Sequence, residues 1–194
     1  MQRTRCRHLG GAATERDLEQ RRHVRSAGCL RQEETALTAE LFDAEQRIRS
    51  VDREHLIIVD RDGTVVYEAA GGADSVQFPR PVARGRIVLH NHPNGSSFSR
   101  KDVQELFLSR ALEFRLVTPA HRHWMRVPSS ASLRPAQRRI AEVYFEEMEA
   151  LREEMTRAGP TFDTAIVDRE HLHRVWTRIA AEFGWNYGRE EVMP

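Results

Sequence analysis

A short stretch of the chain, HNHPNGSSFSRKD at 90–102, concentrates side chains of the kinds that bind metals. His90 and His92 are two residues apart at the end of a predicted strand, so both imidazoles point to the same side. A proline and an Asn-Gly turn then reverse the chain, and Asp102 falls in the first turn of the next predicted helix. Two histidines and one carboxylate leave a fourth position open on a tetrahedral zinc ion, as in catalytic sites. The sequence therefore predicts a Zn²⁺ site with His90, His92 and Asp102 as ligands.

A hydrolytic zinc site also needs a base that takes a proton from water and passes it to the leaving group. Glu54 is the predicted base, since it directly precedes the first predicted strand, 36 residues ahead of the first histidine. Glu45 and Glu68 are the alternatives. Ser99 is predicted to donate a hydrogen bond to the oxyanion of a tetrahedral intermediate. Ser99 and Asp102 also have the spacing of a helix capping box, and an acid at a helix start is compatible with both roles.

The elements that position these residues follow from the spacing of apolar side chains. Residues 33–48 carry them at three- and four-residue steps, which predicts a helix. Residues 56–59 and 64–67 are apolar, β-branched runs joined by a Gly-containing turn, which predicts a hairpin. The segment 71–84 is rich in Gly, Pro and small polar residues and is predicted to be a loop that borders the cleft, with a short strand at 76–78. Further predicted elements are strands at 86–89, 114–118 and 123–127 and a helix at 99–112.

This order of elements predicts an α/β fold with a mixed sheet flanked by helices. Beyond residue 128 the pattern changes to two amphipathic helices, the first of which ends near Gly159, with Trp176 as a core residue of the second. We therefore expect a domain at 32–128 and a C-terminal helical hairpin at 133–194. Residues 1–31 are expected to form a basic, disordered tail.

Composition limits the classes of function. The 194 residues carry a net charge of +1, so no global field attracts nucleic acid or an anionic membrane. The arginine-rich tail could contact nucleic acid, but a solvated tail is the favoured interpretation. No apolar run reaches the roughly 20 residues of a membrane span, and the N-terminus lacks the apolar region of a secretion signal. A cytoplasmic location is the expectation.

The pattern of a Glu before the first strand, HxHP at 90–93 and SxxD at 99–102 resembles the JAMM (MPN+/JAB) zinc metalloproteases, over roughly residues 40–128. The run HNHPNG is most similar to the RadC-like and phage-associated bacterial branch. The resemblance implies a JAMM-like fold, with His90, His92 and Asp102 on zinc, Glu54 as base and Ser99 supporting the transition state. It also implies a protein or peptide substrate cleaved at a peptide or isopeptide bond, often next to a ubiquitin-like or sulfur-carrier protein. Six residues separate His92 from Ser99, where the family usually has seven.

Two other functions stay open at this point. One is a catalytically silent JAMM-fold scaffold that binds proteins through its helical tail. The other is a DNA-associated role like that of the RadC-like branch, through the basic tail. The histidines outside the motif are predicted to be surface residues or core residues with satisfied hydrogen bonds: His55, His121, His123, His171 and His173.

Overall fold

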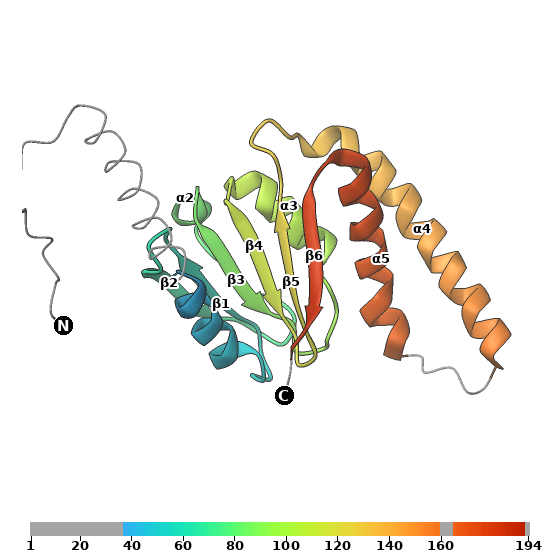
Figure 1. The fold of residues 1–194 in the computed structure, drawn as a ribbon, viewed down its shortest axis with the longest axis horizontal. Helices are drawn as coiled ribbons and strands as arrows, with labels where there is room; N and C mark the ends of the chain where they lie inside the picture. Colours follow the sequence, from blue (N-terminus) through green and yellow to red (C-terminus); the bar gives the residue numbers. More distant parts are fainter. Residues whose placement is uncertain (1–36, 160–164, 193–194) are drawn as a thin grey trace, which may run out of the picture.

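Six strands form one mixed sheet in the order β2-β1-β3-β4-β5-β6 (Figure 1). The computed structural model describes residues 37–159 and 165–192. Neighbouring strands are antiparallel except β3 and β4, which are parallel and connected through helix α3. The strands are β1 (His55–Val59), β2 (Val65–Ala70), β3 (Ile87–Asn91), β4 (Glu113–Val117), β5 (His121–Arg126) and β6 (Asn186–Glu191).

Helices cover both faces of this sheet. Residues 37–48 are helical, and the other helices of the described chain are α2 (Arg80–Ala83), α3 (Arg100–Ser109), α4 (Leu133–Ala158) and α5 (Ala165–Phe183). The predicted mixed α/β class is therefore confirmed, as is the hairpin of β1 and β2. Among the described residues, no helix combines the length and the apolar character that a membrane crossing requires.

The alternation of side chains along the strands separates two apolar clusters. Ile58 and Val88 pack with residues of α3, α4 and α5. Ile57 and Leu89, one position along, pack with the helix at 37–48 on the opposite face. In Figure 1 that helix lies on the near side of the sheet and α3 on the far side. Each strand position is thus assigned to one face, which decides where the polar side chains at the strand ends can meet.

The C-terminal segment contains the two predicted helices, which lie side by side (Figure 1), and also a strand that was not predicted. Val143 of α4 and Trp176 and Ile179 of α5 belong to the same core cluster as the strands, which confirms the core position of Trp176. After α5 the chain continues into β6, which pairs antiparallel with β5. Helices α4 and α5 therefore share the core of the sheet, and β6 extends the sheet.

The predicted strand at 76–78 is wrong. Residues 71–79 contain no strand, and the short helix α2 follows them. Val76 and Phe78 instead pack their side chains against the core cluster of α3, so their apolar character reflects burial without strand pairing. The predicted tail at 1–31 and the first residues of the predicted helix at 33–48 lie outside the described residues.

A network of ion pairs joins the helix at 37–48 to the sheet. The carboxylate of Glu45, which is 1% exposed, accepts hydrogen bonds from Arg115 of β4, at 2.8 Å, and from Arg122 of β5. Arg115 also donates to the buried Glu113 at 2.5 Å. A buried charge is costly unless it is paired and hydrogen-bonded, so these contacts determine where the helix docks.

The substitution Glu45→Ala is expected to lower the free energy of unfolding by about 3 kcal/mol, because it leaves two partly buried guanidinium groups without their shared acceptor. Denaturant-induced unfolding measures this loss. Glu68→Ala is the matched control, since Glu68 is half exposed and contacts Arg47 at 3.5 Å. The control should cost about 0.5 kcal/mol or less. Equal losses for the two variants would contradict a structural role for the network.

Candidate metal centre

The antiparallel pairing of β1 with β3 brings the first predicted site residues together. Leu56 lies directly opposite His90 in this pair. Continuing the same register by two residues places Glu54 opposite His92, and a Glu54 Oε1 to His92 Nε2 distance of 3.7 Å agrees with it. His90 and His92 lie on the face of the sheet that carries α3, with their ring centroids 5.0 Å apart. The side chains of Glu54, His90 and His92 therefore point into the same space on this face of the sheet.

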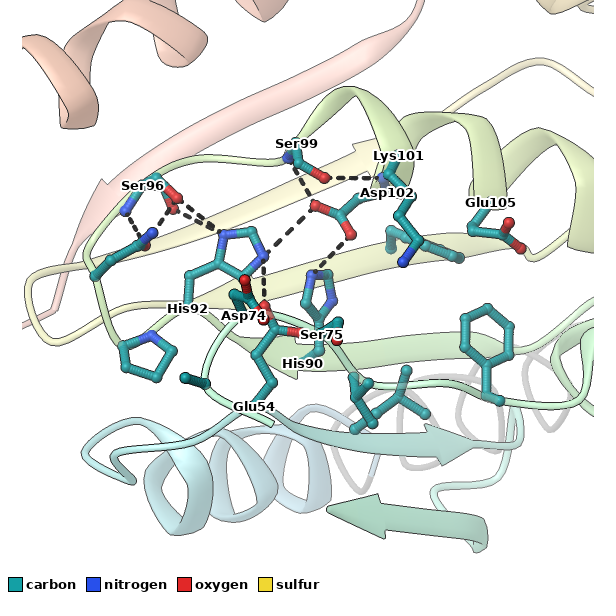
Figure 2. A pocket seen from close by; sticks show the side chains of 17 residues that line it. Glu54, Asp74, Ser75, His90, His92, Ser96, Ser99, Lys101, Asp102 and Glu105 are labelled. Atoms are coloured by element: carbon teal, nitrogen blue, oxygen red, sulfur yellow. Dashed lines mark hydrogen bonds and ion pairs between the residues drawn. The ribbon is translucent and has the colours of Figure 1, made fainter. Parts of the chain in front are cut away.

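Helix α3 supplies the carboxylate. Ser99 caps the helix: its backbone N–H donates to Asp102 Oδ2 at 2.6 Å, and its Oγ accepts from Asp102 N at 3.2 Å. The predicted capping box is confirmed. The same carboxylate points back to the histidines, with Asp102 Oδ1 3.6 Å from His90 Nε2 and Asp102 Oδ2 3.5 Å from His92 Nε2. Figure 2 shows the two imidazoles and the carboxylates of Asp102 and Glu54 directed toward one another.

These separations suit a shared metal ion better than direct hydrogen bonds. The ligand atoms of His90, His92 and Asp102 all lie within 4.8 Å of one another. A tetrahedral ion with ligand bonds of about 2.0–2.1 Å separates its ligands by about 3.3–3.4 Å. The Asp102-to-histidine distances of 3.5 and 3.6 Å are close to that edge length and beyond hydrogen-bonding range.

The orientation of His92 leaves its inner nitrogen available as a ligand. His92 Nδ1 lies 3.3 Å from the carbonyl oxygen of Ser96 and 3.2 Å from Ser96 Oγ. A carbonyl oxygen only accepts hydrogen bonds, so the Nδ1 atom carries the hydrogen and Nε2 keeps its lone pair. Nε2 is the atom that faces Glu54 and Asp102. A hydrogen-bonded outer nitrogen of this kind is common in metal-binding histidines.

The imidazole ring of His90 contributes two buried nitrogen atoms to the cluster. The side chain is 3% exposed, and neither Nδ1 nor Nε2 has a hydrogen-bond partner in the described part of the chain. An unpartnered buried polar atom costs about 1–3 kcal/mol. A cation beside Asp102 would satisfy Nε2, so the residues present fit a metal ion.

Burial and mutual attraction shift the proton affinities of the cluster. Burial raises the pKa of Glu54 above its usual range, and Asp102 and Asp74 raise it further, against the lowering effect of His90. Burial, reinforced by His90, lowers the pKa of His92 to about 4. Burial also favours the neutral form of Asp102, but the attraction of both histidines and the Ser99 hydrogen bond outweigh it, and the pKa of this carboxyl lies well below its usual range. A neutral imidazole and an ionised carboxylate are the forms that bind metals.

The cluster opens into a pocket with a volume of about 150 Å³. Residues 73–76 line its rim, as predicted for the loop after β2. Gly71 begins this loop, and a Cβ there would lie 2.1 Å from the carbonyl oxygen of Ser75, so only glycine allows the close turn. Asp74 reaches the pocket from this loop, and Lys101 and Glu105 reach it from α3 (Figure 2).

Sequence reasoning missed the role of Asn91. It lies between the two histidines and, because side chains alternate along a strand, it faces the opposite side of the sheet. Its amide accepts from His55 N at 2.6 Å and donates to the carbonyl oxygens of Val51 and Arg53, both at 3.1 Å. Asn91 therefore ties the segment that carries Glu54 to the strand that carries the histidines. The only signal in the sequence was its position between them.

The other candidates lie away from the pocket. Glu45 belongs to the ion-pair network on the opposite face, and Glu68 of β2 pairs with Arg47. His171 contacts the carbonyl oxygen of Tyr144 at 2.8 Å, as predicted for a satisfied core histidine. His123 departs from that prediction: it is buried, and its Nε2 lacks a hydrogen-bond partner among the residues described.

Comparison with protein families, with curated proteins and with solved structures found no match to the chain.

The substitution Asn91→Ala is expected to reduce the free energy of unfolding by about 2–3 kcal/mol, because it removes three hydrogen bonds from the buried Asn91 side chain to the backbone of residues 51–55. Asn186→Ala is the control, since Asn186 is exposed and accepts a single hydrogen bond, from Trp124 Nε1. It should cost less than about 1 kcal/mol. Chemical denaturation compares the two, and an Asn91 variant as stable as the control would refute the anchoring role.

Proposed function

We propose that the chain is a zinc-dependent hydrolase of JAMM type that cleaves a peptide or isopeptide bond. The observation that supports this most strongly is the convergence of His90, His92 and Asp102, whose ligand atoms lie within 4.8 Å of one another, while the nitrogens of His90 have no hydrogen-bond partner among the described residues. These three residues would hold the ion. Together with the motif, this chemistry favours a catalytic site of three protein ligands with one position left for water or substrate.

Glu54 is the proposed general base. Zinc, when bound, supplies Lewis acidity that makes hydroxide available near neutral pH. The Glu54 carboxylate lies 3.7 Å from His92 Nε2 and lines the pocket, so it can accept the proton of the attacking water and return it to the leaving nitrogen.

Ser99 is the proposed hydrogen-bond donor to the oxyanion. Its Oγ accepts a hydrogen bond from Asp102 N, so the hydroxyl hydrogen is left to donate elsewhere. The residue lines the same pocket as the proposed base. A donor aimed at the developing negative charge stabilises the transition state more than the substrate.

The proposed substrate is a protein or peptide. The pocket is open, and its rim carries charges of both signs, with Asp74 on the loop after β2 and Lys101 on α3. The resemblance to JAMM proteins suggests isopeptide bonds next to ubiquitin-like proteins among the candidates. Recognition of the rest of the substrate would involve surfaces beyond this small pocket.

Purified wild-type protein is expected to contain one equivalent of zinc, measured by elemental analysis after purification without chelators. The double variant His90→Ala, His92→Ala should contain none, because it retains one of the three ligands. Absence of zinc from the folded wild-type protein, even after zinc is added, would overturn the proposed function.

The substitution Glu54→Gln is expected to retain zinc and to lower hydrolysis of a defined peptide library roughly 10²–10⁴-fold, because it removes the base and leaves the ligands. Mass spectrometry of the library before and after incubation gives the rate. Glu68→Gln, on the exposed edge strand, is the matched control and should cleave at the wild-type rate. Zinc-loaded wild-type protein that is no more active than Glu54→Gln would favour a silent scaffold.

A further inference from the structure

The loop at 93–98, which joins the two histidines to α3, is held by the C-terminal part of the chain. Trp176 of α5 donates its indole N–H to the carbonyl oxygen of Phe98 at 2.6 Å. The hydroxyl groups of Tyr187 in β6 and Ser97 are hydrogen-bonded at 2.9 Å. Ser97 and Phe98 are both buried, so water does not compete for these contacts. Two residues about 80–90 positions away in the sequence thus contact adjacent residues of the loop.

These contacts lie between the proposed metal ligands along the chain. Ser96, next to Ser97, is the residue whose oxygens orient the His92 ring. Ser99, next to Phe98, caps α3 and holds the Asp102 carboxylate. A displacement of residues 97–98 would therefore move the supports of both ligands. The phenyl ring of Phe98 also packs against His90, with ring centroids 6.0 Å apart.

The hydroxyl of Tyr187 is the centre of a small polar cluster. Besides Ser97, it contacts His123 Nδ1 at 3.2 Å and His173 Nδ1 at 2.8 Å. One donated and two accepted hydrogen bonds use the full capacity of a phenol. Burial raises the pKa of Tyr187 and lowers the pKa of His123 and His173, so all three side chains are neutral near pH 7. The cluster therefore supports the loop through hydrogen bonds between neutral groups and brings no charge toward the metal ligands.

We propose that Trp176 and Tyr187 are positioning residues of the metal centre, which hold residues 97–98 so that His92 and Asp102 converge on one ion. The inference rests on the proposed function, since it concerns the same zinc site. It assigns the C-terminal helix and strand a part in metal binding. Metal ligands are sensitive to the residues that orient them, and loss of such a partner typically weakens metal affinity about 10–100-fold.

The variants Trp176→Phe and Tyr187→Phe, in the full chain, remove one hydrogen-bonding group each and keep an aromatic ring. We expect each to bind zinc about 10-fold more weakly or worse in competition with a chromogenic chelator. The visible absorption of the Co²⁺-substituted protein should change as well, because it reports the geometry of the ligands. Trp124→Phe and Tyr144→Phe are the matched controls: the Trp124 indole bonds to Asn186, away from the loop. Both controls should keep wild-type zinc affinity and the wild-type Co²⁺ spectrum.

The variant Ser97→Ala removes the hydrogen bond to Tyr187 by a change in the loop itself. It tests the inference even if the substitution of a core aromatic residue unfolds the protein. Its zinc affinity should fall, and its effect should not add in full to that of Tyr187→Phe in the double variant, because both substitutions remove the hydrogen bond between Ser97 and Tyr187. Wild-type affinity and an unchanged Co²⁺ spectrum in Trp176→Phe, Tyr187→Phe and Ser97→Ala would overturn the inference and leave the zinc site standing. A wild-type protein that binds no zinc overturns the proposed function itself, and the inference with it.

Discussion

The pairing of β1 with β3 is the constraint on which the site depends. Because Leu56 lies opposite His90, Glu54 and His92 lie opposite each other beyond the paired residues, on the same face of the sheet. A shift of the register by one residue would turn Glu54 to the other face and separate it from the histidines. In the observed register Ile58 packs in the cluster with α3 and Ile57 in the cluster with the helix at 37–48, and the hydrogen bond from His55 N to Asn91 holds the start of β1 beside β3.

The two faces of the sheet have different parts in this arrangement. The face that packs on α3 carries the histidines and receives Asp102 from the first turn of that helix. The opposite face carries a second set of supports: Asn91 holds the segment before β1, and Glu45 docks the helix at 37–48 through buried ion pairs. Side-chain alternation in a strand makes this division possible, because adjacent residues serve opposite faces.

Buried polar groups that lack partners are concentrated at and next to the proposed metal centre. In the described part of the chain, the side-chain atoms of this kind belong to His90 and His123. His90 lies among the proposed ligands, and His123 stacks beside Tyr187 in the cluster that contacts the loop. Proteins accept such costs mainly where function requires them. The location of the unpartnered nitrogens is therefore consistent with the site proposed from the motif.

The sequence alone determined the local parts of this protein. The apolar spacing identified the hairpin, the strands of the motif and both C-terminal helices, and the capping box of Ser99 and Asp102 was evident from its spacing. The two-residue step from His90 to His92 was enough to place both on one face, because strand geometry is local. The motif also singled out Glu54, which the structure brings to 3.7 Å from His92.

Only the tertiary structure decided the features that depend on distant partners. Strand β6, with the sequence NYGREE, has no apolar alternation and becomes a strand because β5 offers it a free edge. The same holds for Asn91, whose partners are backbone groups 36–40 residues away, and for the contact between Ser97 and Tyr187, 90 residues apart. The apolar residues at 76–78 pack without a strand partner. Backbone pairing and buried hydrogen bonds of this kind leave little trace in local patterns, because each depends on which groups the completed core brings within reach.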